Sequence, residues 1–258
     1  MREVVAAVFL LAALLGAAPG ADAGAAPAAA SDTNTAAKTG GKMTLPPVEI
    51  RSVVRGADEI FKSGGQVGRE DVVRTTMSNN TVLYESVYQV MEGEGTAVTG
   101  NNKLEVEEDS GFPRSYYTYR RTEGAAGEAV REISVRMYAN VASVSERQGT
   151  EESTRRIVLP AGCLFVEGNI AHHICLVLDR YDRDAGGKQV FRAFDPLGLG
   201  TTDVALEYQG EDEGKLSRYR YYAGGSFAAD VVTDAEGTVA RISATPNELE
   251  YVWKENRQ

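Results

Sequence analysis

The chain has 258 residues, a formal net charge of -10 and a hydrophobic fraction of 43%. This length and apolar content suffice for a sizeable core, and the acidic balance disfavours nucleic acid as a partner because phosphates would be repelled. No segment after residue 23 reaches the roughly 18 consecutive apolar residues of a membrane helix, so we expect no membrane span.

The N-terminus has the layout of a secretory signal peptide over residues 1–23. Arg2 gives a basic start, Val4 to Leu15 form an almost unbroken apolar run, and Ala21 and Ala23 place small residues around a cleavage site. We therefore expect an exported protein, in the periplasm or extracellular, that is soluble after cleavage of the signal.

Residues 24–44 are rich in Ala, Thr and Gly and contain almost no large apolar side chain. Such a segment cannot bury enough surface to offset the entropy of ordering, which predicts a disordered leader. The remaining residues, 45–258, are predicted to form a single antiparallel β domain.

Alternation of apolar and polar residues dominates that domain and predicts many short strands. Thr81–Met91 carries apolar residues on both faces, so we expect it to be covered on both faces. The fold class is mainly β, with a curved antiparallel sheet or half-barrel and one covering helix. The predicted strands are Thr81–Met91, Asn102–Glu107, Arg114–Arg121, Ile133–Val141, Gln189–Phe194, Val204–Tyr208, Leu216–Tyr222, Phe227–Thr233 and Val239–Ala244.

One segment has helical periodicity instead. Its apolar residues recur at intervals of three and four, which predicts a helix near 170–182 with Asn169 as its N-cap and its apolar stripe laid on the sheet. His173 falls on this stripe, whereas its neighbour His172 is expected to face water. The stripe consists of Ile170, His173, Ile174, Val177, Leu178 and Tyr181.

Cys163 and Cys175 are the two cysteines of the chain. In an exported protein an even pair favours a disulfide, although two buried free thiols remain the alternative. The His172–His173 pair lacks the i, i+4 spacing of a helical zinc site, and no standard spacing supports mixed ligation by these cysteines and His172. We expect no metal, no cofactor and no catalytic residues.

Tyrosines are concentrated in the predicted strands. Tyrosine combines an apolar body with a hydroxyl and so suits the wall of a groove that is wet at one end, although aromatic residues are enriched in strands in any case. The residues assigned to a candidate ligand groove are Tyr84, Tyr88, Tyr117, Tyr119, Met137, Ile174 and Val177.

The order of elements also resembles a known kind of protein. A Gly-rich stretch at Ser63–Glu70, the step Phe112–Tyr116, the step Leu159–Pro160 into a short helix and the closing turn Val232–Gly237 carry this resemblance. The chain resembles uncharacterised exported bacterial proteins with a curved antiparallel half-barrel, similar in outline to β-clam carriers of the lipoprotein-localisation type. This resemblance implies an apolar concavity that holds acyl chains.

From these features we expect an exported, non-catalytic protein that binds a lipid or other amphiphile in an apolar groove. Two alternatives stay open. One is an envelope scaffold that holds a partner protein by a sheet edge. The other is a hydrolase with an unfamiliar active site that uses Cys163 or His173.

Overall fold

The structure, a computed structural model, describes residues 47–92, 95–125, 127–167, 171–212, 214–245 and 248–255. The predicted signal peptide (1–23) and leader (24–44) lie outside these residues.

The described residues form fifteen strands that belong to one sheet. The strands are β1 (Ile50–Lys62), β2 (Gly65–Met77), β3 (Thr81–Glu92), β4 (Thr96–Glu107), β5 (Pro113–Gly124), β6 (Gly127–Tyr138), β7 (Val141–Gln148), β8 (Glu151–Val158), β9 (Leu164–Phe165), β10 (Lys188–Asp195), β11 (Gly200–Glu211), β12 (Ser217–Ala223), β13 (Ser226–Thr233), β14 (Val239–Ala244) and β15 (Leu249–Glu255).

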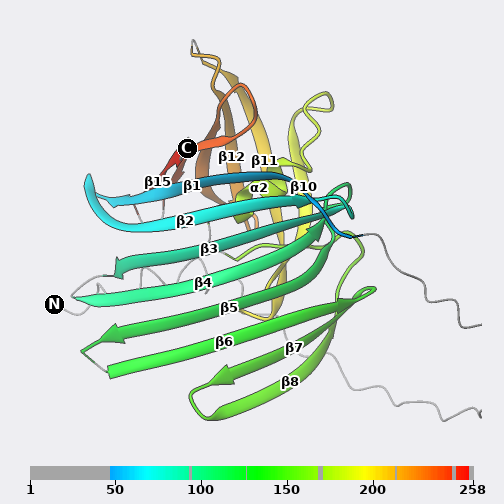
Figure 1. The fold of residues 1–258 in the computed structure, drawn as a ribbon. Coiled ribbons are helices and arrows are strands. Elements are labelled where there is room, and N and C mark those ends of the chain that lie inside the picture. Colours follow the sequence, from blue (N-terminus) through cyan, green and yellow to red (C-terminus); the bar gives the residue numbers. More distant parts are fainter. Residues whose placement is uncertain are drawn as a thin grey trace, which may run out of the picture.

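Consecutive strands pair antiparallel from β1 to β8 and from β10 to β15, so the sheet consists of two meanders joined where β1 pairs with β15. The strand order ends at β8 on one side and at the short β9 on the other, and β9 is parallel to β10. In Figure 1 the strands β2–β8 run across the view, while β10–β12 stand nearly upright. The sheet is therefore strongly curved but not closed, and the predicted mainly β fold class is confirmed.

The junction of the two meanders depends on a glycine. Trp253 of β15 lies opposite Asp58 of β1, and its ring occupies the space where a Cβ atom of Gly56 would stand. A residue with a side chain at position 56 would displace this ring, since side chains cannot share that space.

Most predicted strands are confirmed, but Ile133–Val141 is not one strand. The chain turns at Ala139 and Asn140, where Ala139 adopts a positive φ of 52°, and Val141 begins β7. The apolar alternation runs on through Ala139 and Val141, although Ala139 lies in the turn and the inward side chains of β7 are Ala142 and Val144. Periodicity alone therefore could not locate the turn.

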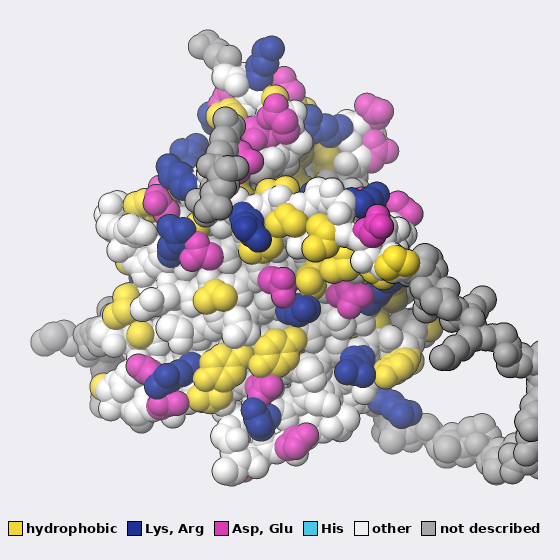
Figure 2. All heavy atoms as spheres, in the orientation of Figure 1, with side chains coloured by type: hydrophobic (Ala, Val, Ile, Leu, Met, Phe, Trp, Pro, Cys, Tyr) yellow, Lys and Arg dark blue, Asp and Glu magenta, His cyan; other side chains and the backbone are white. Residues whose placement is uncertain are grey.

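The prediction that Thr81–Met91 is covered on both faces is wrong. Val87 is 62% exposed and Met91 is 44% exposed, whereas Tyr84 and Tyr88 on the opposite face are buried. Figure 2 shows the outer face of this half, where hydrophobic side chains are scattered among acidic and basic ones. One face of the strand is therefore solvated, as is usual for antiparallel sheets.

The helix is shorter than predicted. α2 spans His173–Leu178, and the predicted N-cap Asn169 lies outside the described residues. Beyond α2 the carboxylate of Asp182 accepts backbone N–H groups of a turn, yet Tyr181 remains buried. The apolar stripe therefore continues past the end of the helical backbone.

The segment between β8 and β10 fills the concave side of the sheet, and α2 packs against both halves of it. Ile174 and Val177 belong to an apolar cluster with the inner side chains of β11–β14, here called the C-terminal core. Leu176 belongs to a second cluster with the inner side chains of β3–β7, here called the N-terminal core. Because this segment buries apolar side chains in both cores, it ties the two halves of the sheet together.

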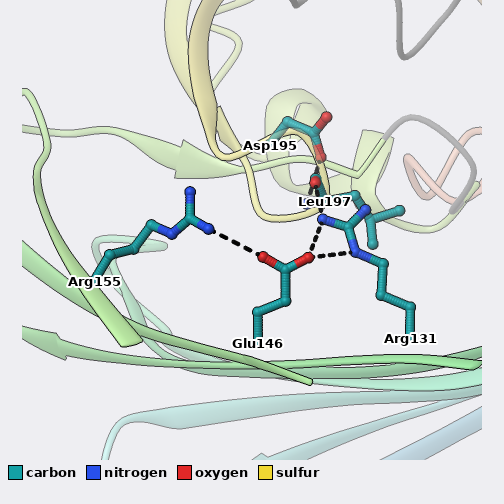
Figure 3. A network of polar contacts seen from close by, with 5 residues as sticks. All are labelled: Arg131, Glu146, Arg155, Asp195 and Leu197. Carbon is teal, nitrogen blue, oxygen red and sulfur yellow. Dashed lines mark hydrogen bonds and ion pairs between the residues drawn. The ribbon is translucent and has the colours of Figure 1, made fainter. Parts of the chain in front are cut away.

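Polar contacts connect the β6–β8 side to the turn after β10 (Figure 3). Arg131 of β6 donates to the Glu146 carboxylate and to the Leu197 carbonyl, each at 2.8 Å. Arg155 of the edge strand β8 donates to the same Glu146 at 3.3 Å, and Asp195 accepts from the Leu197 N–H at 2.9 Å. Side chains thus link regions near the two ends of the sheet, where no backbone ladder joins them.

Candidate functional site

A row of polar side chains crosses the concave face of the N-terminal half. Glu70 of β2 is paired in register with Tyr88 of β3, and Ser86 of β3 is paired with Asn102 of β4, which is paired with Thr118 of β5. All five side chains are buried. Since residues two apart on a strand share a face, the alternation of β2–β5 sets this row on the concave side.

The row lies between a packed end and a less covered end of the half-barrel. On one side of it the concave face is closed by the N-terminal core, which includes Leu104 and Val135. On the other side Val90 and Thr122 are half-buried, and Ala129 is exposed. The polar row therefore separates the packed part of the concave face from the part that solvent reaches.

Two carboxylates hold the segment between β8 and β10 against this row. Glu70 accepts from the Ala171 N–H at 3.3 Å and lies 2.9 Å from His172 Nδ1. Tyr116 of β5 donates its hydroxyl hydrogen to Glu167. These contacts, named here the carboxylate latch, join residues more than fifty positions apart in the sequence and fix the histidines inside the barrel.

The prediction that His172 faces water is wrong, because Glu70 and Tyr84 bury it. The Tyr84 ring stacks on the His172 ring with centroids 5.8 Å apart, and His173 lies edge-on to His172 at 4.7 Å. His173 is fully buried, as its place on the apolar stripe predicted.

The backbone fixes the tautomer of His173. The Glu167 N–H donates to His173 Nδ1 at 3.0 Å, so the ring hydrogen of the neutral imidazole lies on Nε2. Burial, and then the neighbouring His172, lower the pKa of His173 well below its usual value. His173 is therefore neutral and presents an N–H donor to the interior.

Three buried carboxyl groups have raised pKa values, which favours their protonated forms. Burial and then Glu70 raise the pKa of Asp58 to about 8. Burial, followed by the charges of Asp195 and Glu70, raises the pKa of Glu167 well above its usual value. Burial also raises the pKa of Asp195, against the opposing effect of hydrogen bonds from the Leu197 and Gly198 backbone. Desolvation of carboxyl groups is thus the main electrostatic feature of this region.

Several buried polar atoms along this row have no hydrogen-bond partner within the described part of the chain. Native proteins satisfy nearly all such atoms with protein, water or ligand, so a concentration of them in one region indicates a place where another molecule is bound. The atoms are Ser86 Oγ, Tyr88 Oη, Asn102 Nδ2, Asn102 Oδ1, Glu167 Oε1, His172 Nε2 and His173 Nε2.

The predicted groove residues divide between the two faces of the sheet. The buried Tyr84 and Tyr88 lie on the concave side. Tyr117 and Tyr119 alternate with the buried Tyr116 and Thr118 and so lie on the outer face. Met137 packs on the N-terminal core, and Ile174 and Val177 belong to the C-terminal core. The structure thus brings five of the seven residues to the inside: Tyr88 lies on the polar row, and the other four, Tyr84 included, lie in or against the apolar cores.

The predicted disulfide between Cys163 and Cys175 is not formed, and both are free thiols. Cys163 belongs to the N-terminal core, whereas Cys175 packs against the C-terminal core from the middle of α2. Burial raises the pKa of Cys163 to about 11. A buried thiol with this pKa is a poor nucleophile, which argues against the hydrolase that uses Cys163.

The Glu70–His172 pair has the form of a carboxylate that orients an imidazole, with Nε2 left open to act as a base. Within the described residues, however, no hydroxyl or thiol is hydrogen-bonded to that nitrogen. Nor does that part of the chain contain a group of three His, Cys, Asp or Glu side chains suited to a metal ion.

Comparison with known proteins gives a likeness of fold. No family model and no curated protein matches the chain. A solved structure that resembles it is described as a beta-barrel-like protein of domain of unknown function DUF1849 from Brucella abortus, with a TM-score of 0.50 and 10% sequence identity over 81% of this chain and 98% of that chain. At this identity the likeness shows the fold alone. It supports a barrel-like β architecture and leaves the resemblance to β-clam carriers unconfirmed.

No helix in the described ranges is long and apolar enough to cross a bilayer.

The predicted site residues did not include Asp58, Glu70 or Glu167. Glu70 shares a strand face with Val72, and this polar residue at an inward position was the available signal.

Proposed function

We propose that this is an exported, non-catalytic carrier that binds a small amphiphile on the concave side of its half-barrel. The observation that carries the proposal is the concentration of buried, unpartnered polar atoms on one row of the concave face. A folded protein that left these atoms unpaired would lose about 1–3 kcal/mol for each of them, so a bound group or ordered water must satisfy them.

The position of the row suits a ligand with two chemically different ends. The polar end reaches Ser86, Tyr88 and Asn102, while the apolar end lies along Val90 and the buried Val98, toward the less covered end of the barrel. Pockets for small molecules commonly combine an apolar lining with a few convergent polar groups. Burial of each methylene contributes about 0.8 kcal/mol, so a short acyl chain would suffice for binding.

Ser86→Leu tests whether this region accepts a guest. If the row lines a binding site, the leucine side chain fills it and removes an unpaired hydroxyl, so stability is kept while the neutral fluorescent probe N-phenyl-1-naphthylamine binds at least tenfold more weakly. If the region is a filled core, overpacking costs about 1–3 kcal/mol. Ser134→Leu is the matched control, because Ser134 is exposed on the outer face.

The readouts are probe titration by fluorescence and unfolding in urea. Failure of the wild type to bind the probe more strongly than an unrelated β protein would contradict the carrier proposal. So would a Ser86→Leu protein that is destabilised and binds like the wild type.

A second candidate function, holding a partner protein, is favoured by β8. This strand ends the sheet order, and its residues are exposed apart from the half-buried Ile157. An edge strand with free backbone groups can accept a strand from another chain. Recovery of one protein in stoichiometric amount with this chain, without a bound amphiphile, would favour this function over the carrier.

A further inference from the structure

The concave region is rich in buried carboxyl groups and poor in cations available to balance them. Asp58, Glu70, Glu167 and Asp195 are each at most 4% exposed. Within the described residues none of the four forms an ion pair with a lysine or arginine, and the His172 contact of Glu70 is their one ion-pair contact. Buried carboxylates without cations are rare, because the loss of hydration is expensive.

Of the arginines on this side of the sheet, Arg74 lies over the Tyr84 ring, and Arg120 and Arg131 already have carboxylate partners. Arg120, on the concave side of β5, pairs with Glu92 at 3.3 Å. Arg131 pairs with Glu146 at 2.8 Å and also donates to the Leu197 carbonyl. The remaining buried carboxyls therefore have to be neutralised by protons or by a cation from outside the chain.

Unpartnered acceptors and aromatic rings accompany these carboxyls. Oε1 of Glu167, Oδ1 of Asn102 and the hydroxyl oxygen of Tyr88 are buried and unpaired within the described residues. Tyr88 stands opposite Glu70 in the β2–β3 register, and its hydroxyl reaches the space above Gly100, so its ring lies along the polar row. An ammonium group offers only donors, and it is attracted both to carboxylates and to the faces of aromatic rings.

We propose that the amphiphile carries an ammonium head group, which Glu167 receives on the polar row beside Tyr88 and Asn102. This inference rests on the carrier function proposed above and names the chemical class of its ligand. An ammonium group stabilises the carboxylate form of Glu167 and takes the place of its proton. An anionic head group would be repelled by the carboxylate form, and a neutral head group would form no ion pair with it.

Three short amphiphiles with the same eight-carbon chain separate these classes. Octylamine, octanoate and 1-octanol each displace N-phenyl-1-naphthylamine from the wild-type protein at pH 7.5, and the concentration for half displacement is compared. Octylamine is expected to displace the probe at a concentration at least tenfold lower than octanoate and severalfold lower than octanol.

The net charge of the protein by itself attracts cations, so the local effect needs a matched control. Glu167→Gln keeps a carbonyl oxygen that can accept from Tyr116 but removes the carboxyl. In this variant octylamine and octanoate should displace half of the probe at similar concentrations. Glu85→Gln removes a carboxyl from the outer face, where Glu85 pairs with Lys103, and should leave the preference unchanged. Unfolding in urea confirms that both variants fold.

Each outcome decides between the two proposals. If the probe binds and octanoate or octanol displaces it as well as octylamine does, the ammonium class is wrong and the carrier function stands. Equal effects of Glu167→Gln and Glu85→Gln would also overturn the assigned site. If the wild type does not bind the probe at all, the carrier function fails and the ammonium inference fails with it.

Discussion

The two halves of the sheet share one topology but differ in what they turn inward. The inner side chains of β11–β14 are mainly apolar and pack on Ile174 and Val177 of α2. The inner face of β2–β5 is apolar at the end closed by the N-terminal core and again at Val98, and between them it carries Glu70, Ser86 and Asn102 in paired register. Both halves are antiparallel meanders, so the polar row does not follow from the architecture.

Under the carrier function proposed above, the C-terminal half serves stability and the N-terminal half serves binding as well. Buried polar groups lower stability unless they are paired, and proteins retain such groups mainly at functional sites. The carboxylate latch belongs to the same region, since Glu70 both lies on the polar row and fixes the segment that carries the histidines.

Removal of the latch should have the largest effect on stability. Glu70→Ala leaves the Ala171 N–H and the His172 ring nitrogen without their acceptor, and loss of one partner of a buried pair costs about 3–5 kcal/mol. Unfolding in urea measures the loss. Glu70→Gln, which retains an acceptor, should be less destabilised. A loss for Glu70→Ala no larger than that for the exposed Glu85→Ala would show that the latch does not hold the interior together.

A matched pair of core substitutions compares the two halves directly. Leu104 in the N-terminal core and Leu206 in the C-terminal core are both fully buried. Leu104→Ala and Leu206→Ala should each cost about 2–5 kcal/mol, because each leaves a cavity in packed surroundings. Thermal or urea unfolding gives both values. A cost near zero for Leu104→Ala alone would mean that the N-terminal core is loosely packed, and that the binding region extends into it.

The pH dependence of stability should change when Asp58 is replaced. The pKa of Asp58 is raised from 3.8 to about 8, so the native state holds a proton that the unfolded state releases between these values. Stability contributed by this group is therefore lost as pH rises from about 4 to about 8. The side chain of Asp58→Asn does not titrate. The free energy of unfolding of this variant should therefore fall less steeply with rising pH, by up to about 1.4 kcal/mol per pH unit.

Urea unfolding of the wild type and of Asp58→Asn at pH 5, 6 and 7 measures this difference in slope. Glu167 also lowers the free energy of unfolding as pH rises, because burial raises its pKa, and it does so in both proteins. Glu85→Gln serves as the control for the loss of an exposed carboxyl. Identical slopes for the wild type and Asp58→Asn would contradict the assignment of Asp58 as a buried, protonated acid.

Local sequence patterns located most of the strands, and the limits of those patterns explain the errors. β3 and β14 were predicted almost to their ends because alternation and turn residues bound them on both sides. β8 was not predicted, since its residues are nearly all polar and exposed and therefore show no alternation. Tyr117 and Tyr119 were assigned to the groove because composition does not reveal which face of a strand turns inward.

The sequence by itself determined that this is a mainly β protein with a short helical stripe, since period-two alternation and the turn residues are local properties of the chain. Only the tertiary structure decided that Glu70 meets His172 across 102 positions, that Tyr116 meets Glu167, and that the two cysteines lie in different cores. These contacts depend on strand register and on the curvature that folds the sheet around residues 159–167 and 171–181. Register and curvature are set by packing between distant segments, which no local pattern encodes.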